Sequence, residues 1–332
     1  MEDLKEALNK FKEKKILVMG DIILDKFTWG VVERINPEQP AASLVKVCNE
    51  TYKLGGAANV ANNVSSLGAR CCLVGVIGKG SYGYKVKELC VEKGIKLKAF
   101  YDERPTLVKQ RIVAHNQQLS RLDFGENNLE KIKPEIQEEI IKYLKNELVN
   151  NNYDYMILSD YDKEFFSREF CQEIIQIANS IKIPVHVDPK PKNIDFFRNC
   201  NVMSPNKREA QEITGIKYSN GKDVLMSMSE ALSQLSNPQY VVITCGKDGV
   251  FGYDIEKKES LLIGTKARDV ADVTGAGDTF AAALPLALSS GLNLFDSVKL
   301  ANYASGVVVE KVGTAVPTIE EIKNKIKEDN NI

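Results

Sequence analysis

The chain has 332 residues, enough for one large α/β domain or two medium ones, and its 43% apolar and 27% charged residues are ordinary for a globular protein. Its formal net charge is -1 and no basic block dominates, which argues against nucleic-acid binding. No apolar run approaches the ~20 residues needed to span a bilayer, and the charged N-terminus is unlike a signal peptide.

Short apolar runs alternate with amphipathic helical stretches along most of the chain. The first run is residues 16–19, which ends in Gly20-Asp21. Further runs lie at residues 72–77, 155–158, 185–187 and 241–244, and two of the helical candidates lie at residues 134–148 and 170–181. This alternation predicts an α/β fold with a central, mostly parallel sheet flanked by helices.

Two segments depart from this alternation. Residues 26–52 and 98–124 contain runs of Val, Ile, Leu and Thr without a helical stretch, and we interpret both as antiparallel strands. We expect them to form a small β-sheet lid beside the carboxyl ends of the parallel strands, where α/β proteins bind ligands. No repeat or linker divides the chain, so we expect a single domain over residues 1–332.

The stretch D-V-T-G-A-G-D-T-F at residues 272–280 precedes an apolar helix that runs to about Gly291. Gly275 and Gly277 remove side chains from the helix entrance, so backbone N–H groups there can bind an anion at the positive end of the helix dipole. Asp278, in the first turn, can accept the proton of an attacking hydroxyl. The alternative is that Asp278 only caps the helix. Pro285 predicts a bend in this helix.

The cysteines and histidines suggest a reducing compartment and no zinc site. None of the seven cysteines belongs to a C-x-x-C pair, and His115 and His186 lie far apart in the sequence. An odd number of scattered cysteines fits the cytosol better than a secreted disulfide framework. We expect a cytoplasmic protein that binds neither nucleic acid nor membranes.

The stretch D-V-T-G-A-G-D-T-F resembles the signature of the ribokinase-like carbohydrate kinases, the PfkB family. Residues 55–61, G-G-A-A-N-V-A, resemble the second signature of that family, and the resemblance runs from about residue 16 to residue 314. It implies a ribokinase-like fold and a sugar kinase that uses ATP and Mg²⁺.

The resemblance also implies roles at the matching positions. Asp278 would be the catalytic base, and the N–H groups of Gly275, Ala276 and Gly277 would form an anion hole. In N-K-R-E, Asn206 would bind the nucleotide phosphates and Glu209 a Mg²⁺ ion. The other implied positions are Thr244, Gly246, Gly249 and Asn302 at the nucleotide, and Asp21, Asp25, Gly55, Gly56 and Asn59 at the sugar.

Within the family, several stretches most resemble the kinases of D-glycero-D-manno-heptose 7-phosphate, often the first half of a bifunctional ADP-heptose synthase. One is residues 109–124, where Lys109, Arg111 and Arg121 can neutralise a phosphate and Asn116 and Gln117 can bind hydroxyls. The other interpretation is that these are solvent-exposed strand residues. The resemblance implies phosphoryl transfer to O1 of the heptose, in ADP-heptose synthesis for lipopolysaccharide. The H-x-G-H motif of the second half is absent, so we expect no nucleotidyltransferase domain and a separate adenylyltransferase.

Other functions stay open. Within the family, the substrate could be fructose 6-phosphate or ribose, because lid geometry sets specificity. A non-catalytic sugar-phosphate sensor is disfavoured because it would not need Asp278. G-K-G-S-Y-G at residues 78–83, followed by Asp102, could indicate a dinucleotide-binding oxidoreductase, but it follows a complete βα unit. Because exposed lid edges need covering, we also expect a homodimer through the lids.

Overall fold

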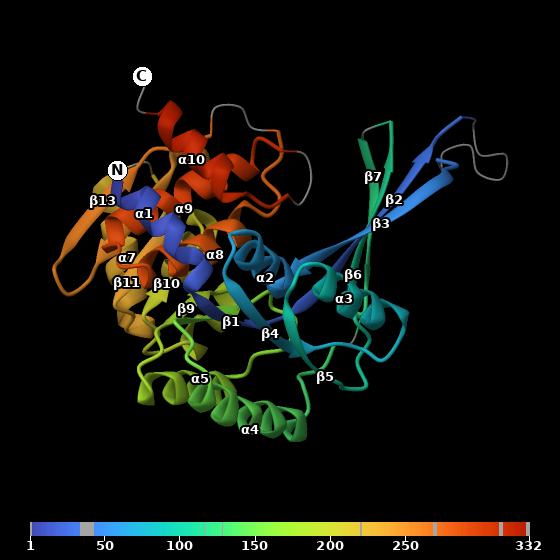
Figure 1. The fold of residues 1–332 in the computed structure, drawn as a ribbon, viewed down its shortest axis with the longest axis horizontal. Helices are drawn as coiled ribbons and strands as arrows, with labels where there is room; N and C mark the ends of the chain where they lie inside the picture. Colours follow the sequence, from blue (N-terminus) through green and yellow to red (C-terminus); the bar gives the residue numbers. More distant parts are fainter. Residues whose placement is uncertain are drawn as a thin grey trace.

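The computed structural model describes residues 2–33, 43–115, 117–127, 129–219, 221–267, 271–311 and 315–329. Within these residues the chain forms a large sheet with helices on both faces and a small sheet that projects from its side (Figure 1).

Across the described residues, the large sheet has nine strands in the order β13-β12-β11-β10-β9-β8-β1-β4-β5. Their bounds are Lys15–Gly20 (β1), Arg70–Val76 (β4), Lys96–Phe100 (β5), Tyr155–Ser159 (β8), Val185–Asp188 (β9), Val202–Met203 (β10), Tyr240–Thr244 (β11), Val250–Asp254 (β12) and Glu259–Ile263 (β13). Neighbouring strands from β5 to β11 are parallel, whereas β12 and β13 pair antiparallel at one edge. The predicted mostly parallel sheet is confirmed.

Helices cover both faces of this sheet. Their bounds are Glu2–Lys10 (α1), Ala57–Ser66 (α2), Ser81–Glu92 (α3), Pro134–Asn150 (α4), Arg168–Ser180 (α5), Lys207–Thr214 (α6), Lys222–Ser236 (α7), Ala276–Ser289 (α8), Leu294–Val308 (α9) and Ile319–Glu328 (α10), with short 3-10 turns at Phe11–Glu13, Pro191–Phe196 and Gly246–Asp248. In Figure 1, α8, α9 and α10 lie on one side of the sheet and α4 and α5 on the other.

Strand β1 shows how one sequence run builds two cores. Ile16 and Val18 belong to the apolar core shared with α1, α2, α8 and α9. Leu17 and Met19 belong to the core shared with α4, α5 and α7. Successive side chains of a strand point to opposite faces, so an unbroken apolar run marks a strand buried on both sides.

Helix α8 is buried on nearly all sides because it lies between α2, α9 and the sheet. Its buried residues run without a break from Thr279 to Ala287, as expected for a core helix that is apolar all round. The helix continues past Pro285 to Ser289, and the bend expected at that proline stays a prediction.

The small sheet has the order β3-β2-β6-β7. Its strands are Ile22–Val31 (β2), Lys46–Gly56 (β3), Leu107–Ala114 (β6) and Gln117–Phe124 (β7). A small sheet built from the two predicted segments is therefore confirmed.

Two details of the small sheet differ from the prediction. Residues 98–100 belong to β5 of the large sheet, not to the small one. The strands are not all antiparallel, because β2 and β6 pair parallel. Parallel neighbours need a long crossover connection, and here the chain between them passes through α2, β4, α3 and β5 of the large body.

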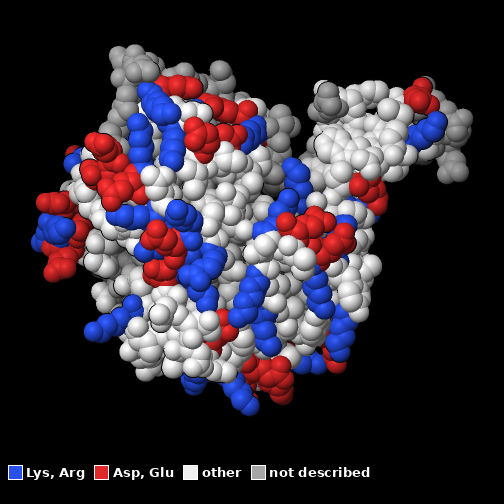
Figure 2. Space-filling model, viewed as in Figure 1, with Lys and Arg blue, Asp and Glu red and all other residues white. Residues whose placement is uncertain are grey.

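Acidic and basic side chains are interspersed over the face of the body that Figure 2 shows, whereas the projecting sheet presents mainly uncharged atoms there. Among the residues that the structure describes, no helix combines the length and the apolar character needed to cross a membrane.

Candidate active site

The two glycine-containing motifs of the sequence meet at the N-termini of α2 and α8. The Asn59 side-chain Nδ2 donates to Asp278 Oδ2 at 2.6 Å, although the two residues are 219 positions apart in the chain. Asn59 is 1% exposed. The prediction placed Asn59 at the sugar, and the structure places its amide on the carboxylate of the predicted base.

Tyr161 holds the other oxygen of the same carboxylate. Its hydroxyl donates to Asp278 Oδ1, and its backbone N–H donates to Asp21 Oδ2 at 2.8 Å. Tyr161 lies just beyond the carboxyl end of β8, at the edge where a parallel sheet collects functional residues. Tyr161 is not among the site residues predicted from the sequence, and the available signal was its position three residues after the predicted strand at residues 155–158.

The surroundings of Asp278 raise the pKa of its carboxyl group. Burial is the largest cause and the neighbouring Asp25 charge adds to it, while the hydrogen bonds from Tyr161 and Asn59 oppose the shift. A carboxylate with a raised pKa is a better proton acceptor when it is ionised. Gly275, not Asp278, is the N-cap of α8, and the Asp278 carboxylate bonds Asn59 and Tyr161 instead.

The turn before α8 is where the sequence predicts an anion hole. Gly275 is the N-cap residue with φ 84°, a left-handed conformation that glycine adopts without strain. The Ala276 N–H donates to Val273 O at 3.3 Å, so that group, predicted to bind an anion, is engaged. Within the described parts of the chain, the N–H groups of Gly275 and Gly277 have no acceptor, and a Cβ on Gly277 would meet open space.

The predicted sugar-binding carboxylates are buried and hold neighbouring elements. Asp21, 3% exposed, accepts hydrogen bonds from the N–H groups of Tyr161 and Lys163. Asp25 Oδ1 accepts from Arg111 Nη1 at 2.6 Å. Beside Asp25, a Cβ on Gly55 would lie 2.7 Å from Asp25 Oδ2, so a glycine is needed for this close approach.

Gly56 lets the start of α2 approach β2. It has φ 57°, and a Cβ there would lie 2.4 Å from Asp21 O. The Ala57 N–H donates to the same carbonyl at 2.9 Å. Gly55 and Gly56 thus act through the backbone. They let β3 and the start of α2 approach β2 closely, and this sets the position of Asn59 in the first turn of α2.

Two of the predicted phosphate ligands, Lys109 and Arg111, lie on β6 beside Asp25. Lys109 pairs with Asp25 across β6 and β2, and its Nζ lies 5.7 Å from the centre of the Tyr161 ring. Burial lowers the pKa of Lys109. Arg111, two residues on, lies on the same face and is bonded to Asp25.

The other predicted small-sheet residues lie farther out. Arg121 pairs with Arg111 across β6 and β7 and forms an ion pair with Asp123 at 2.9 Å. Gln117 pairs with Ala114 at the outer end of the β6–β7 hairpin, roughly 17 Å along the strand from Lys109. Asn116 lies outside the described residues.

On the nucleotide side, Asn206 and Thr244 lie side by side as a parallel bridge. Asn206 caps α6 by accepting from the N–H groups of Arg208 and Glu209, and Glu209 Oε2 accepts from the Asn206 N–H at 2.8 Å. The other Glu209 oxygen bonds Lys190 Nζ. Each oxygen of the predicted metal ligand therefore accepts one hydrogen bond. In the described residues, no group of three or more His, Cys, Asp or Glu side chains forms a metal-binding cluster.

The remaining predicted nucleotide residues gather where β13 ends. Gly249 has φ 97°, and a Cβ there would lie 1.9 Å from Ile263 O. Asn302 on α9 is 5% exposed and donates from Nδ2 to Gly264 O at 2.8 Å. Gly246 has φ 63° and lies in the turn between β11 and β12. Together with Thr244, these residues form one edge of the candidate site, and this edge is made largely of backbone groups.

Lys190 connects the two halves of the site. Its Nζ lies 5.6 Å from the Tyr161 ring centre and bonds Glu209, so one cation faces both the base and the α6 cap. Burial opposes its charge, but the carboxylates of Asp188 and Glu209 raise the pKa of Lys190. Its position between the two halves makes Lys190 a candidate phosphate ligand.

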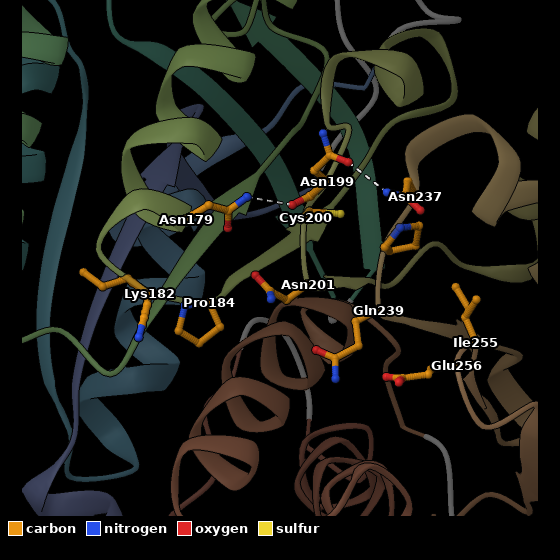
Figure 3. Close-up of a pocket in the computed structure, with 12 residues that line it drawn as sticks. Asn179, Lys182, Pro184, Asn199, Cys200, Asn201, Asn237, Gln239, Ile255 and Glu256 are labelled. Carbon is orange, nitrogen blue, oxygen red and sulfur yellow. Dashed lines mark hydrogen bonds between the residues drawn. The ribbon is translucent and has the colours of Figure 1, made fainter.

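A cavity of about 720 Å³ lies at the opposite edge of the sheet. Its lining includes the residues just before β9, β10 and β11, so it borders the amino ends of these strands (Figure 3). Its asparagines bond one another, with Asn179 donating to Asn199 O and Asn237 to Asn199 Oδ1. This cavity is therefore separate from the candidate site.

Comparison with known proteins identifies the family of this chain. The family model described as pfkB family carbohydrate kinase matches residues 13–321. Among curated proteins, the bifunctional protein HldE of Campylobacter concisus is 38% identical over 314 residues, which are 94% of this chain and 64% of that protein. HldE of Wolinella succinogenes is 39% identical over 309 residues, 92% of this chain and 63% of that protein. The chain thus spans less than two thirds of the length of these relatives.

Solved structures share the fold. Phosphofructokinase-2 from Escherichia coli, in a complex with potassium, has a TM-score of 0.77 at 16% identity, over 95% of this chain and 98% of that one. Ribokinase from Giardia lamblia has a TM-score of 0.73 at 20% identity, over 95% and 99% of the two chains. The expected ribokinase-like fold is confirmed.

The buried position of Asp21 predicts a pH-dependent stability. Burial and the Asp160 charge raise the pKa of Asp21 to about 7, above its unfolded value of about 3.9. The protonated form therefore stabilises the fold at low pH, and this contribution is lost as pH rises toward 7. We expect the free energy of unfolding of Asp21→Asn, relative to wild type, to rise between pH 4 and 7 by at most about 1.4 kcal/mol per pH unit.

Urea unfolding of both proteins across pH 4–8 measures this difference. Asp223→Asn, an exchange at an exposed position on α7, is the matched control and should show no such trend. If the difference in free energy of unfolding between Asp21→Asn and wild type does not change between pH 4 and 7, this would contradict the raised pKa of Asp21.

Proposed function

The chain belongs to the pfkB family of carbohydrate kinases, and we propose that it transfers the γ-phosphoryl group of ATP to O1 of D-glycero-D-manno-heptose 7-phosphate. The products would be the 1,7-bisphosphate and ADP. The observation that carries this proposal is the Asp278 carboxylate, held by Asn59 and Tyr161 next to the glycine turn of α8 and the Lys109–Arg111 pair.

In the proposed reaction, Asp278 accepts the proton of the O1 hydroxyl as that oxygen attacks the γ-phosphorus. The O1–P bond forms while the bond from the γ-phosphorus to the bridging oxygen breaks, and ADP leaves with the electron pair. The N–H groups of Gly275 and Gly277 and the Lys190 ammonium would stabilise the charge on the transferred group. Asn59 and Tyr161 would keep the carboxylate pointed at the hydroxyl.

The nucleotide would lie along the edge formed by Thr244, Gly246, Gly249 and Asn302, with Asn206 near its phosphates. Mg²⁺ bound to ATP would supply further positive charge to the phosphates. Glu209 accepts from the Asn206 N–H with one oxygen and from Lys190 with the other, so it is placed to orient Lys190, and each oxygen keeps a lone pair for the ion or its water. Mg²⁺ is commonly held through substrate phosphates and only one or two carboxylates.

Lys109 and Arg111 support a substrate that carries its own phosphate. Two cations on one strand face beside the base can bind a phosphate with charge-assisted hydrogen bonds, and Arg111 retains donors beyond the one given to Asp25. The heptose phosphate itself is favoured by the whole-segment resemblance of residues 109–124 and by the curated HldE relatives. Fructose 6-phosphate or ribose is the second candidate, since phosphofructokinase-2 and ribokinase share the fold.

A substrate panel tests this proposal. The protein is incubated with Mg-ATP and heptose 7-phosphate, unphosphorylated heptose, fructose 6-phosphate or ribose, while ADP release is followed and the product is identified by ³¹P NMR. We expect turnover chiefly with heptose 7-phosphate. Lys109→Met should raise KM for heptose 7-phosphate about tenfold or more, because it removes a cation from a partly buried phosphate contact.

The matched control is Lys98→Met, on β5 of the large sheet, which should leave KM unchanged. Turnover of only fructose 6-phosphate or ribose would contradict the heptose assignment. A Lys109→Met variant with wild-type KM would contradict the placement of the substrate phosphate.

We further propose that the chain forms a homodimer through the small sheets. All eight residues of the edge strand β7 are exposed, and an exposed edge strand readily pairs or packs with another chain. Leu122 and Phe124 on β7 are 41% and 43% exposed and lie on the same face of that strand. A second copy would cover these apolar side chains.

Light scattering and sedimentation velocity test the dimer. We expect a dimeric mass for wild type at micromolar concentration and a monomeric mass for the double variant Leu122→Glu with Phe124→Glu, because each added charge would be buried. Val91→Glu, at a position on α3 that is 79% exposed, should remain dimeric. A wild-type monomer would refute the dimer, and a dimeric double variant would refute this interface.

A further inference from the structure

Pro285 creates a hydrogen-bonding defect inside α8. In an α-helix the N–H of each residue donates to the carbonyl four positions earlier. Proline has no N–H, so Pro285 cannot donate to the carbonyl of Ala281. Ala281 is 1% exposed and Pro285 is also buried, and a buried carbonyl without its usual donor destabilises the fold.

His186 supplies the missing donor from another element. Its Nδ1 lies 3.2 Å from Ala281 O, although the two residues are 95 positions apart. His186 lies on β9 and is 0% exposed. An imidazole from the sheet thus replaces the backbone N–H that the helix lacks.

The contact of the second ring nitrogen, together with burial, determines the protonation and the tautomer of His186. Nε2 lies 2.7 Å from Ser204 Oγ. Burial lowers the pKa of His186 to about 4, so the ring is neutral near pH 7. Because the Ala281 carbonyl can only accept, Nδ1 carries the proton, and Nε2 accepts from the Ser204 hydroxyl.

This chain of contacts joins the two halves of the candidate site. Ala281 lies about one turn beyond Asp278 on α8. His186 precedes Lys190 by four residues, and Ser204 precedes the α6 cap residue Asn206 by two. A displacement of α8 along β9 would therefore change the position of the base relative to Lys190 and the α6 cap.

We propose that His186 is a positioning residue for phosphoryl transfer, which holds α8 in register with β9 by taking the place of the N–H that Pro285 removes. This inference rests on the proposed role of Asp278. It predicts that His186 and Pro285 are coupled, because a residue with an N–H at position 285 makes the imidazole donor unnecessary.

Four variants test the coupling: His186→Leu, His186→Asn, Pro285→Ala and the double variant His186→Leu with Pro285→Ala. His186→Leu should lower kcat about tenfold or more with little change in KM, because small displacements of a catalytic group are costly. His186→Asn keeps a side-chain N–H near the Nδ1 position and should retain most of kcat. Pro285→Ala should be near wild type, and in the double variant it should restore most of the kcat lost in His186→Leu.

Two kinetic outcomes would overturn the inference. One is wild-type kcat in His186→Leu. The other is a double variant that unfolds at the temperature of wild type but keeps the low kcat of His186→Leu, since a restored helix would then not restore the base.

NMR of the histidine rings gives a second readout that does not depend on activity. The chain has two histidines, so a His115→Gln sample assigns the His186 ring signals in a long-range ¹H–¹⁵N spectrum. We expect the neutral tautomer with the proton on Nδ1. A proton on Nε2 would refute the contact. If wild type turns over none of the sugars, the proposed function fails, yet the tautomer still decides the His186–Ala281 contact.

Discussion

The candidate site depends on one buried carboxylate, that of Asp278. Removing a carboxylate from water is costly unless hydrogen bonds compensate. Here the compensation comes from Asn59 at the start of α2 and Tyr161 after β8. These donors meet only if α2, α8 and the carboxyl end of β8 are packed together. The site can therefore form only when the large sheet and its helices have folded.

The cost of burying a charge also explains why the charged groups around Asp278 have partners. Asp25 pairs with Arg111 and Glu209 with Lys190, and Asp21 accepts hydrogen bonds from backbone N–H groups of the segment that carries Tyr161. Lys109 and Lys190 both lie near the Tyr161 ring. The result is a carboxylate at the centre with cations on two sides, which suits the transfer of a phosphoryl group from one substrate to the other.

Much of this could be predicted because it depends on local sequence. Apolar runs alternating with helices predict the parallel sheet, and the glycine turn before Asp278 predicts the anion site. Tyr161 was missed because its role comes from a contact across 117 positions of the chain. The parallel pairing of β2 with β6 depends on the path of the chain between them, and the engaged N–H of Ala276 depends on the turn geometry.

Pro285 also shows what cannot be predicted from a single sequence. The sequence shows a proline in a helix, which predicts a lost hydrogen bond, but it does not show which residue replaces the donor. His186 was identified as a strand residue, and only the fold brings its ring to Ala281. Contacts between distant, buried side chains are set by packing, which a single sequence does not reveal.

The most direct test of the account is the kcat of Asp278→Asn on the best sugar substrate. The exchange keeps the size of the side chain, and the Tyr161 hydroxyl can reverse to accept from the new amide, so folding and ATP affinity should be retained. The account predicts a loss of kcat of about 100-fold to 10,000-fold, the range for a positioned general base. A variant that keeps more than about a tenth of wild-type kcat would contradict the role of Asp278 as the base.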